Sequence, residues 1–196
     1  MIIKKLAAVR RIEALCFSLH RHQRFRIARK WYEKAAEKGD ADAKVYLERL
    51  SITEAAGAGD YAEALQLQEA YAAKVEALET KRESKPGEET AKALSSVAWH
   101  ALFAREFAKA LTVAEQAHAL LPDNLSIETN RAHALMFLER GEDCKALYLA
   151  YKGKPMSEQD ARLWEHVIVK DFAEFRKAGL THPMMADIEK ELGVSP

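Results

Sequence analysis

The chain has 196 residues, with 30 Lys and Arg against 30 Asp and Glu, and its formal net charge is zero. Its Gly and Pro residues are few, and no run of about 18 apolar residues is present that could cross a bilayer. This composition favours helix throughout, excludes a membrane-spanning protein, and makes the cytoplasm the expected location.

The zero net charge conceals an asymmetry between the start of the chain and the rest. Residues 1–30 contain nine Lys and Arg and the single acid Glu13, so they carry +8 and the remaining residues carry −8. Arg21, Arg24 and Arg26 form a candidate basic patch that can attract nucleic-acid phosphates, anionic lipid, or an acidic surface of a partner or second copy. The alternative is that the apolar residues between them pack inward while the charges are solvated. Basic residues in the first eleven positions also interrupt any secretory signal.

Alanine recurs in similar surroundings along the chain, at spacings of 36, 46 and 36 residues. The four positions are Ala28, Ala64, Ala110 and Ala146. An aromatic residue stands three positions before each of the first three, whereas Asp143 precedes the fourth. A period of this length predicts stacked pairs of antiparallel helices, because one pair cannot bury its apolar faces alone.

Four repeat units are expected within one domain, at residues 9–44, 45–90, 91–126 and 127–156, with a C-terminal cap at 157–196. The spacing of 46 arises in the second unit, whose second helix is expected to be unusually long, at about residues 61–82. A polar loop follows at residues 81–87 and is the best candidate for a protease-sensitive site.

In the cap, Ser157 and Asp160 predict the start of a helix, and Pro183 is expected to open a last short helix. An apolar stripe on the first of these helices should cover the end of the stack. Its members are Leu163, Trp164, Val167, Ile168, Phe172 and Phe175. The alternative is a free helix that seeks a groove elsewhere.

The third unit carries a series of small, aromatic and proline residues at Ala98, Phe107, Ala110, Ala117 and Pro122. Through this series the units resemble tetratricopeptide repeats (TPR). The first unit resembles the related Sel1-type repeat through the segment WYEKAAEKGD at residues 31–40. The resemblance implies an all-α, right-handed solenoid of stacked helix pairs that holds other proteins, and it implies no reaction.

Patterns that would carry catalysis are absent from the sequence. There is no HExxH, CxxC, glycine-rich phosphate loop or GxSxG elbow. Cys16 and Cys144 lie on helical patterns and are expected to be buried small hydrophobes, and His118 and His133 are expected to be surface or seam residues. We therefore expect a protein that is not an enzyme and has no catalytic residue, cofactor or metal.

The first helix of each unit is expected to line an inner, concave face. Cationic and aromatic residues predicted on this face are Arg10, Phe17, Tyr46, Arg49, Lys92, Trp99 and Arg131. Such a mixture suits an extended peptide with acidic or C-terminal carboxylate groups. The alternative is that Trp99 packs in a seam and the arginines face solvent. Some family members hold a peptide carboxylate with a set of lysine and asparagine residues. Here Glu13 and Phe17 occupy positions of that set, so this specific activity is not expected.

The sequence thus predicts a scaffold or adaptor that binds a partner protein or peptide, acidic ones included, on its concave face. One alternative is a regulatory or targeting segment associated with a separate enzyme. Binding of nucleic acid or an anionic surface through residues 1–30 is the third and least favoured reading.

Overall fold

The computed structural model describes residues 21–194, and in this part of the chain all regular elements are helices. The all-α expectation is confirmed. The helices are α2 (Arg21–Glu37), α3 (Ala41–Ala58), α4 (Tyr61–Glu83), α5 (Glu88–Phe103), α6 (Phe107–Leu120), α7 (Leu125–Phe137), α8 (Gly141–Ala150), α9 (Trp164–Lys177) and α10 (Met184–Leu192). Within these residues, no helix is both long and apolar enough to cross a membrane.

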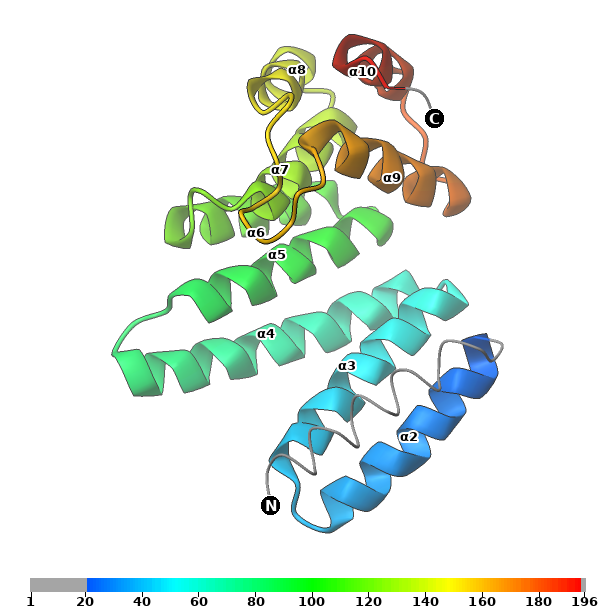
Figure 1. Ribbon diagram of the computed structural model, residues 1–196, viewed down its shortest axis with the longest axis vertical. Coiled ribbons are helices and arrows are strands. Elements are labelled where there is room, and N and C mark those ends of the chain that lie inside the picture. The colour runs from blue at the N-terminus through cyan, green and yellow to red at the C-terminus, as the bar shows by residue number, and fades with distance from the viewer. Residues whose placement is uncertain (1–20, 195–196) are drawn as a thin grey trace. The chain divides into compact units, whose positions relative to one another are not determined.

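Contacts divide the chain into two compact units, Met1–Ala58 and Gly59–Pro196, which we call unit 1 and unit 2. The expected single domain stays a prediction. The described part of unit 1 is the helix pair α2 and α3 (Figure 1). The rings of Tyr32 and Tyr46 stack with centroids 5.1 Å apart, and Arg29 donates to the hydroxyl of Ser51 at 3.1 Å.

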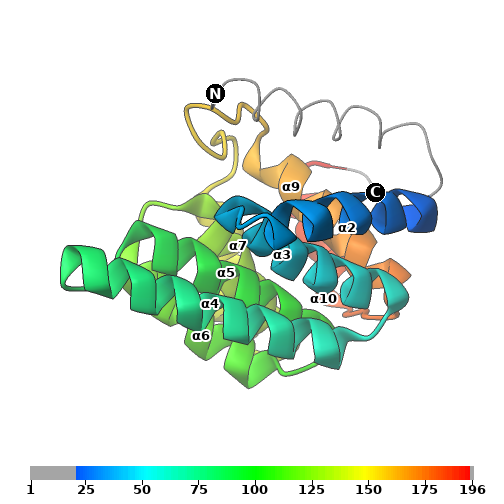
Figure 2. The ribbon, with the colours of Figure 1, turned by 90° about the horizontal axis from the view of Figure 1, so that it is seen from below.

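In unit 2, the helices from α4 to α8 pack against one another in chain order (Figures 1 and 2). Helices α5 and α7, which are not neighbours in sequence, also contact each other. Ala98 on α5 and Ala110 and Ala114 on α6 are fully buried. Their small side chains let these two helices approach closely, as the sequence predicted for Ala98 and Ala110.

The turns that follow α5 and α7 have the same geometry. Arg105 and Glu139 are both in the left-handed region, with φ of 62° and 59°. The backbone hydrogen bonds that close the two turns join residues at the same offsets, and the turns are 34 residues apart. Cys144 therefore takes the place of Ala110 in the next pair, and it is fully buried while Ala146 is exposed. The prediction that Ala146 occupies the repeat position was wrong. That position is two residues earlier, because the period between these two pairs is 34 rather than 36 residues.

Leucine at these two positions tests the corrected register. Ala110→Leu should lower the free energy of unfolding by about 1–3 kcal/mol, because no space remains between α5 and α6. Ala146→Leu, the matched control, should change it by less than about 0.5 kcal/mol, because Ala146 faces solvent. Urea denaturation measures both, and equal losses would contradict the register.

The C-terminal helices differ from the expectation in where they start. The segment 151–163 is irregular, with an isolated antiparallel bridge between Pro155 and Leu163, and α9 begins at Trp164 rather than near Ser157. The hydroxyl of Ser157 accepts from the backbone N–H of Asp160, so the expected capping contact closes a turn instead of starting a helix. Pro183 does precede α10, as expected.

The apolar stripe of the cap is largely confirmed. Trp164, Ile168, Phe172 and Phe175 are fully buried, whereas the other two predicted members are half-buried. These four side chains belong to one core with α5 to α8 and α10. Helix α9 is therefore an integral part of unit 2.

Candidate partner-binding face

The residues predicted for the concave face are divided between the two units. Arg10 and Phe17 lie outside the described residues. In unit 1, Tyr46 is half-buried in its stack with Tyr32, and Arg49 is exposed on α3. Lys92, Trp99 and Arg131 belong to unit 2, on α5 and α7.

The predicted basic patch lies on α2. Arg26 is exposed there. Arg21 and Arg24 begin the same helix, but their side chains lie outside the described part of the chain. The binding roles of all these residues stay predictions.

Trp99 is half-buried among aromatic side chains. Its ring lies 4.9 Å from Phe103 and 5.3 Å from Phe175 of α9, measured between centroids. The residue 34 positions later is His133, and its ring lies 5.0 Å from the same Phe175. Helix α9 thus places one phenylalanine across corresponding positions of α5 and α7, a contact that the sequence reasoning missed.

Arg131 differs from Lys92 and Trp99 in its register. With the period of 34, it corresponds to Val97, which is buried on α5. Its guanidinium lies 2.7 Å from the buried carboxylate of Glu128, which also lies 2.6 Å from Nδ1 of His118 on α6. Arg131 was predicted on the inner face because a period of 36 residues aligns it with Ser95 instead.

Lys92 remains exposed on α5, and its ammonium group pairs with Glu88 one helical turn earlier at 2.5 Å. Ser126 on α7 corresponds to Lys92 and is also exposed. Between the two helices, Nδ2 of Asn130 donates to the carbonyl and hydroxyl oxygens of Ser95 at 2.9 and 3.0 Å. These buried bonds fix α5 relative to α7.

A chain of polar groups joins α7, α8 and α9. Nδ1 of His133 lies 2.7 Å from the hydroxyl of Tyr148, and Nε2 lies 3.3 Å from a carboxylate oxygen of Asp171. A neutral imidazole with its proton on Nε2 satisfies both contacts. Burial raises the pKa of Tyr148 well above its ordinary value. His133 and Tyr148 are fully buried, and these contacts link the three helices.

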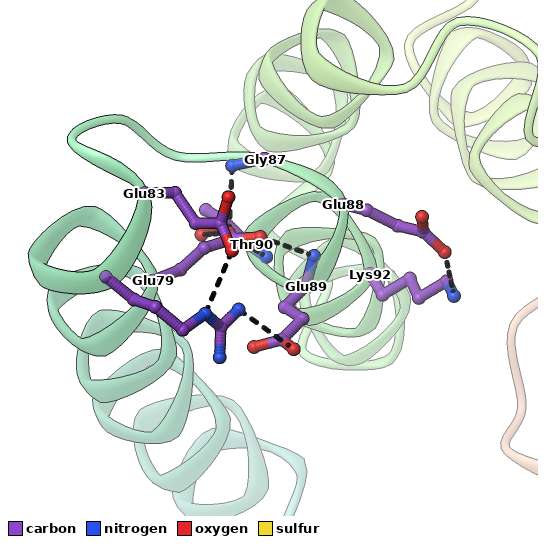
Figure 3. A network of polar contacts seen from close by, with 8 residues as sticks. Glu79, Glu83, Gly87, Glu88, Glu89, Thr90 and Lys92 are labelled. Atoms are coloured by element: carbon purple, nitrogen blue, oxygen red, sulfur yellow. Dashed lines mark hydrogen bonds and ion pairs between the residues drawn. The ribbon is translucent and has the colours of Figure 1, made fainter.

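Near its C-terminal end the long helix α4 carries a carboxylate that caps the next helix (Figure 3). Glu79 accepts hydrogen bonds from the backbone N–H groups of Gly87, Glu89 and Thr90 at 2.8 to 3.1 Å, and from the Thr90 hydroxyl at 2.5 Å. A Cβ atom at Gly87 would lie 3.0 Å from this carboxylate, so glycine allows the approach. A carboxylate at a helix N-terminus is favourable because it accepts from N–H groups that have no partner within the helix.

We expect this cap to make stability depend on pH. The Thr90 hydroxyl, followed by the backbone N–H groups, holds the pKa of Glu79 at about 2, below its ordinary value of 4.5. A lowered pKa means that the stabilisation is complete above about pH 4.5 and is lost as the pH falls towards 2. Glu79→Gln should therefore lower the thermal midpoint at pH 7, and the difference from wild type should shrink between pH 5 and pH 2. A Glu76→Gln control, on the exposed side of α4, should show no such convergence.

Cys144 on α8 faces α10, with its sulfur 3.9 Å from that of Met184. Burial raises the pKa of its thiol to about 11. This confirms the buried environment expected for Cys144, while Cys16 lies outside the described residues. Over residues 21–194, no three His, Cys, Asp or Glu residues are grouped so that they could hold a metal ion.

Comparisons of the chain with protein-family models, curated proteins and solved structures found no match. The TPR resemblance therefore depends on the residues quoted above. Function has to be argued from the geometry of the described residues.

Proposed function

We propose that this chain is a non-enzymatic scaffold of the TPR class, built as a solenoid of helix pairs, that binds a partner protein or peptide on the inner face of α5 and α7. Three observations support the architecture: sequential packing of the helices, contact between α5 and α7, and equivalent turns 34 residues apart. Repeats of this length typically stack into an extended binding surface.

The observation that carries the proposal is the position of α9. Phe175 contacts Trp99 on α5 and both His133 and Phe137 on α7. This face therefore already accommodates a helix through an aromatic side chain. A surface with that property is suited to helical or extended peptides, which dock through a few side-chain anchors.

An exposed part of the face remains beside this aromatic contact. We call it the open strip, and it consists of Glu88, Lys92 and Ser96 on α5 and Ser126 on α7. The exposed pair of Lys92 and Glu88 contributes only about 0–1 kcal/mol. Lys92 can therefore leave Glu88 and pair with a carboxylate of a ligand at little cost in free energy. Acidic peptides are for this reason among the proposed partners.

Site-specific photocrosslinking tests this function. A photoreactive phenylalanine analogue at Ser96 should crosslink a discrete partner, whereas the same group at Thr112, exposed on α6, should not. Lys92→Glu should weaken the crosslink from Ser96 without changing the helix content measured by circular dichroism. A partner that crosslinks equally from Thr112 would contradict binding on the inner face.

A further inference from the structure

Helix α2 exposes a large aromatic residue among lysines. Trp31 is 56% exposed, Lys30 and Lys34 are exposed on the same side of α2, where Ile27 is half-buried, and Lys38 is exposed in the turn directly after the helix. Nζ of Lys34 lies 5.9 Å from the centroid of the Trp31 ring. Lys30 and Lys34 are four residues apart, or about 6 Å along the helix, and Lys38 follows four residues later. We call these five residues the Trp31 face.

Arg29 of α2, which is not part of the Trp31 face, forms an ion pair with Glu54 of α3 and donates to Ser51. The hydrogen bond to Glu54 is the main cause that raises the pKa of Arg29, and the charge of Glu33 adds to it. Glu33 lies near Arg29, and Glu33 and Glu37 are both exposed three residues after Lys30 and Lys34. The three lysines outnumber these two acids, so the surface around Trp31 keeps a net positive charge.

We propose that the Trp31 face binds single-stranded nucleic acid, with a base stacked on the Trp31 indole and phosphates paired with Lys30, Lys34 and Lys38. Proteins bind single strands through this combination of an aromatic platform and cations along the backbone. An interfacial membrane helix needs a wide apolar face instead, and here Ile27 is the one apolar neighbour in the face. This binding is independent of the inner face of unit 2.

Fluorescence anisotropy of a labelled 20-nucleotide oligouridylate, titrated with the full chain in 50 mM salt, tests the proposal. Trp31→Ala should weaken binding about tenfold, and Trp31→Phe should retain most of it because phenylalanine still stacks. Lys34→Glu should also weaken binding about tenfold and reduce its salt dependence. Lys44→Glu makes the same charge change at an exposed site on α3, and it should change the affinity less than about threefold.

Three outcomes would overturn the proposal. The first is no anisotropy change for the wild-type chain at protein concentrations up to about 100 μM, the weak end of sequence-independent binding. The second is an equal loss of affinity in Lys34→Glu and Lys44→Glu, which would indicate a diffuse charge effect. The third is binding to vesicles with 30% phosphatidylserine by a chain that does not bind the oligouridylate, which would assign the face to a membrane. Unchanged circular dichroism of each variant excludes unfolding as the cause.

Discussion

Replacing Phe175 with alanine should lower the free energy of unfolding of unit 2 by about 3–5 kcal/mol. Phe175 is fully buried, and its ring contacts Trp99, Phe103, His133 and Phe137. Alanine would leave a cavity among these four rings. The rings cannot move in to fill it, because each also packs against other neighbours. Urea denaturation monitored by tryptophan fluorescence measures the loss.

The matched control is Lys177→Ala, two residues later on the exposed side of α9. Its ion pair with Glu174 is exposed, so the change should remain within about 0.5 kcal/mol. If Phe175→Ala cost no more than this control, α9 would not pack on α5 and α7 as described, and the main support for the proposed function would be lost.

Truncation after Lys154 should have a still larger effect. It removes α9 and α10, and with them the four fully buried residues Trp164, Ile168, Phe172 and Phe175. The loss of several such side chains exceeds the typical stability of a whole domain, about 5–15 kcal/mol. The truncated chain should lose cooperative thermal unfolding and aggregate, as followed by circular dichroism and light scattering.

Truncation after Val194 is the corresponding control, because it removes only the last two residues, 195 and 196. Its thermal midpoint should stay within about 3 °C of wild type. A monomeric protein truncated after Lys154 with an unchanged midpoint would show that α5 to α8 fold without the cap.

Local sequence patterns predicted much of unit 2 correctly. Periodic small residues identified the close packing of α5 and α6, and Pro183 marked the start of α10. These features depend on residues within one or two helical turns, where spacing and backbone chemistry determine the outcome. The register of α8 was missed because Ala146 resembled a repeat alanine, although Cys144 fills that position.

Contacts between residues far apart in the chain could not be predicted in this way. Trp99 and Phe175 are 76 residues apart in the sequence, and the local pattern around one residue does not indicate the other as its contact. The same holds for Arg105, whose guanidinium donates to the carbonyl of Gly179 at 2.9 Å. These contacts place α9 and the turn after it against α5 and the turn that follows α5. Sequence reasoning could state that the stripe of α9 would be buried, but not that it would contact Trp99, one of the residues predicted to bind a partner.

The cap formed by Glu79 links the end of one helix to the beginning of another. Helix ends ordinarily fray on their own, and their amide hydrogens exchange quickly with solvent. Here the N–H groups of Gly87, Glu89 and Thr90 are bonded to a side chain of α4, so they can open only when the last turns of α4 release that carboxylate. Hydrogen exchange at these three amides should therefore be slow and should report the opening of two helices as one cooperative unit.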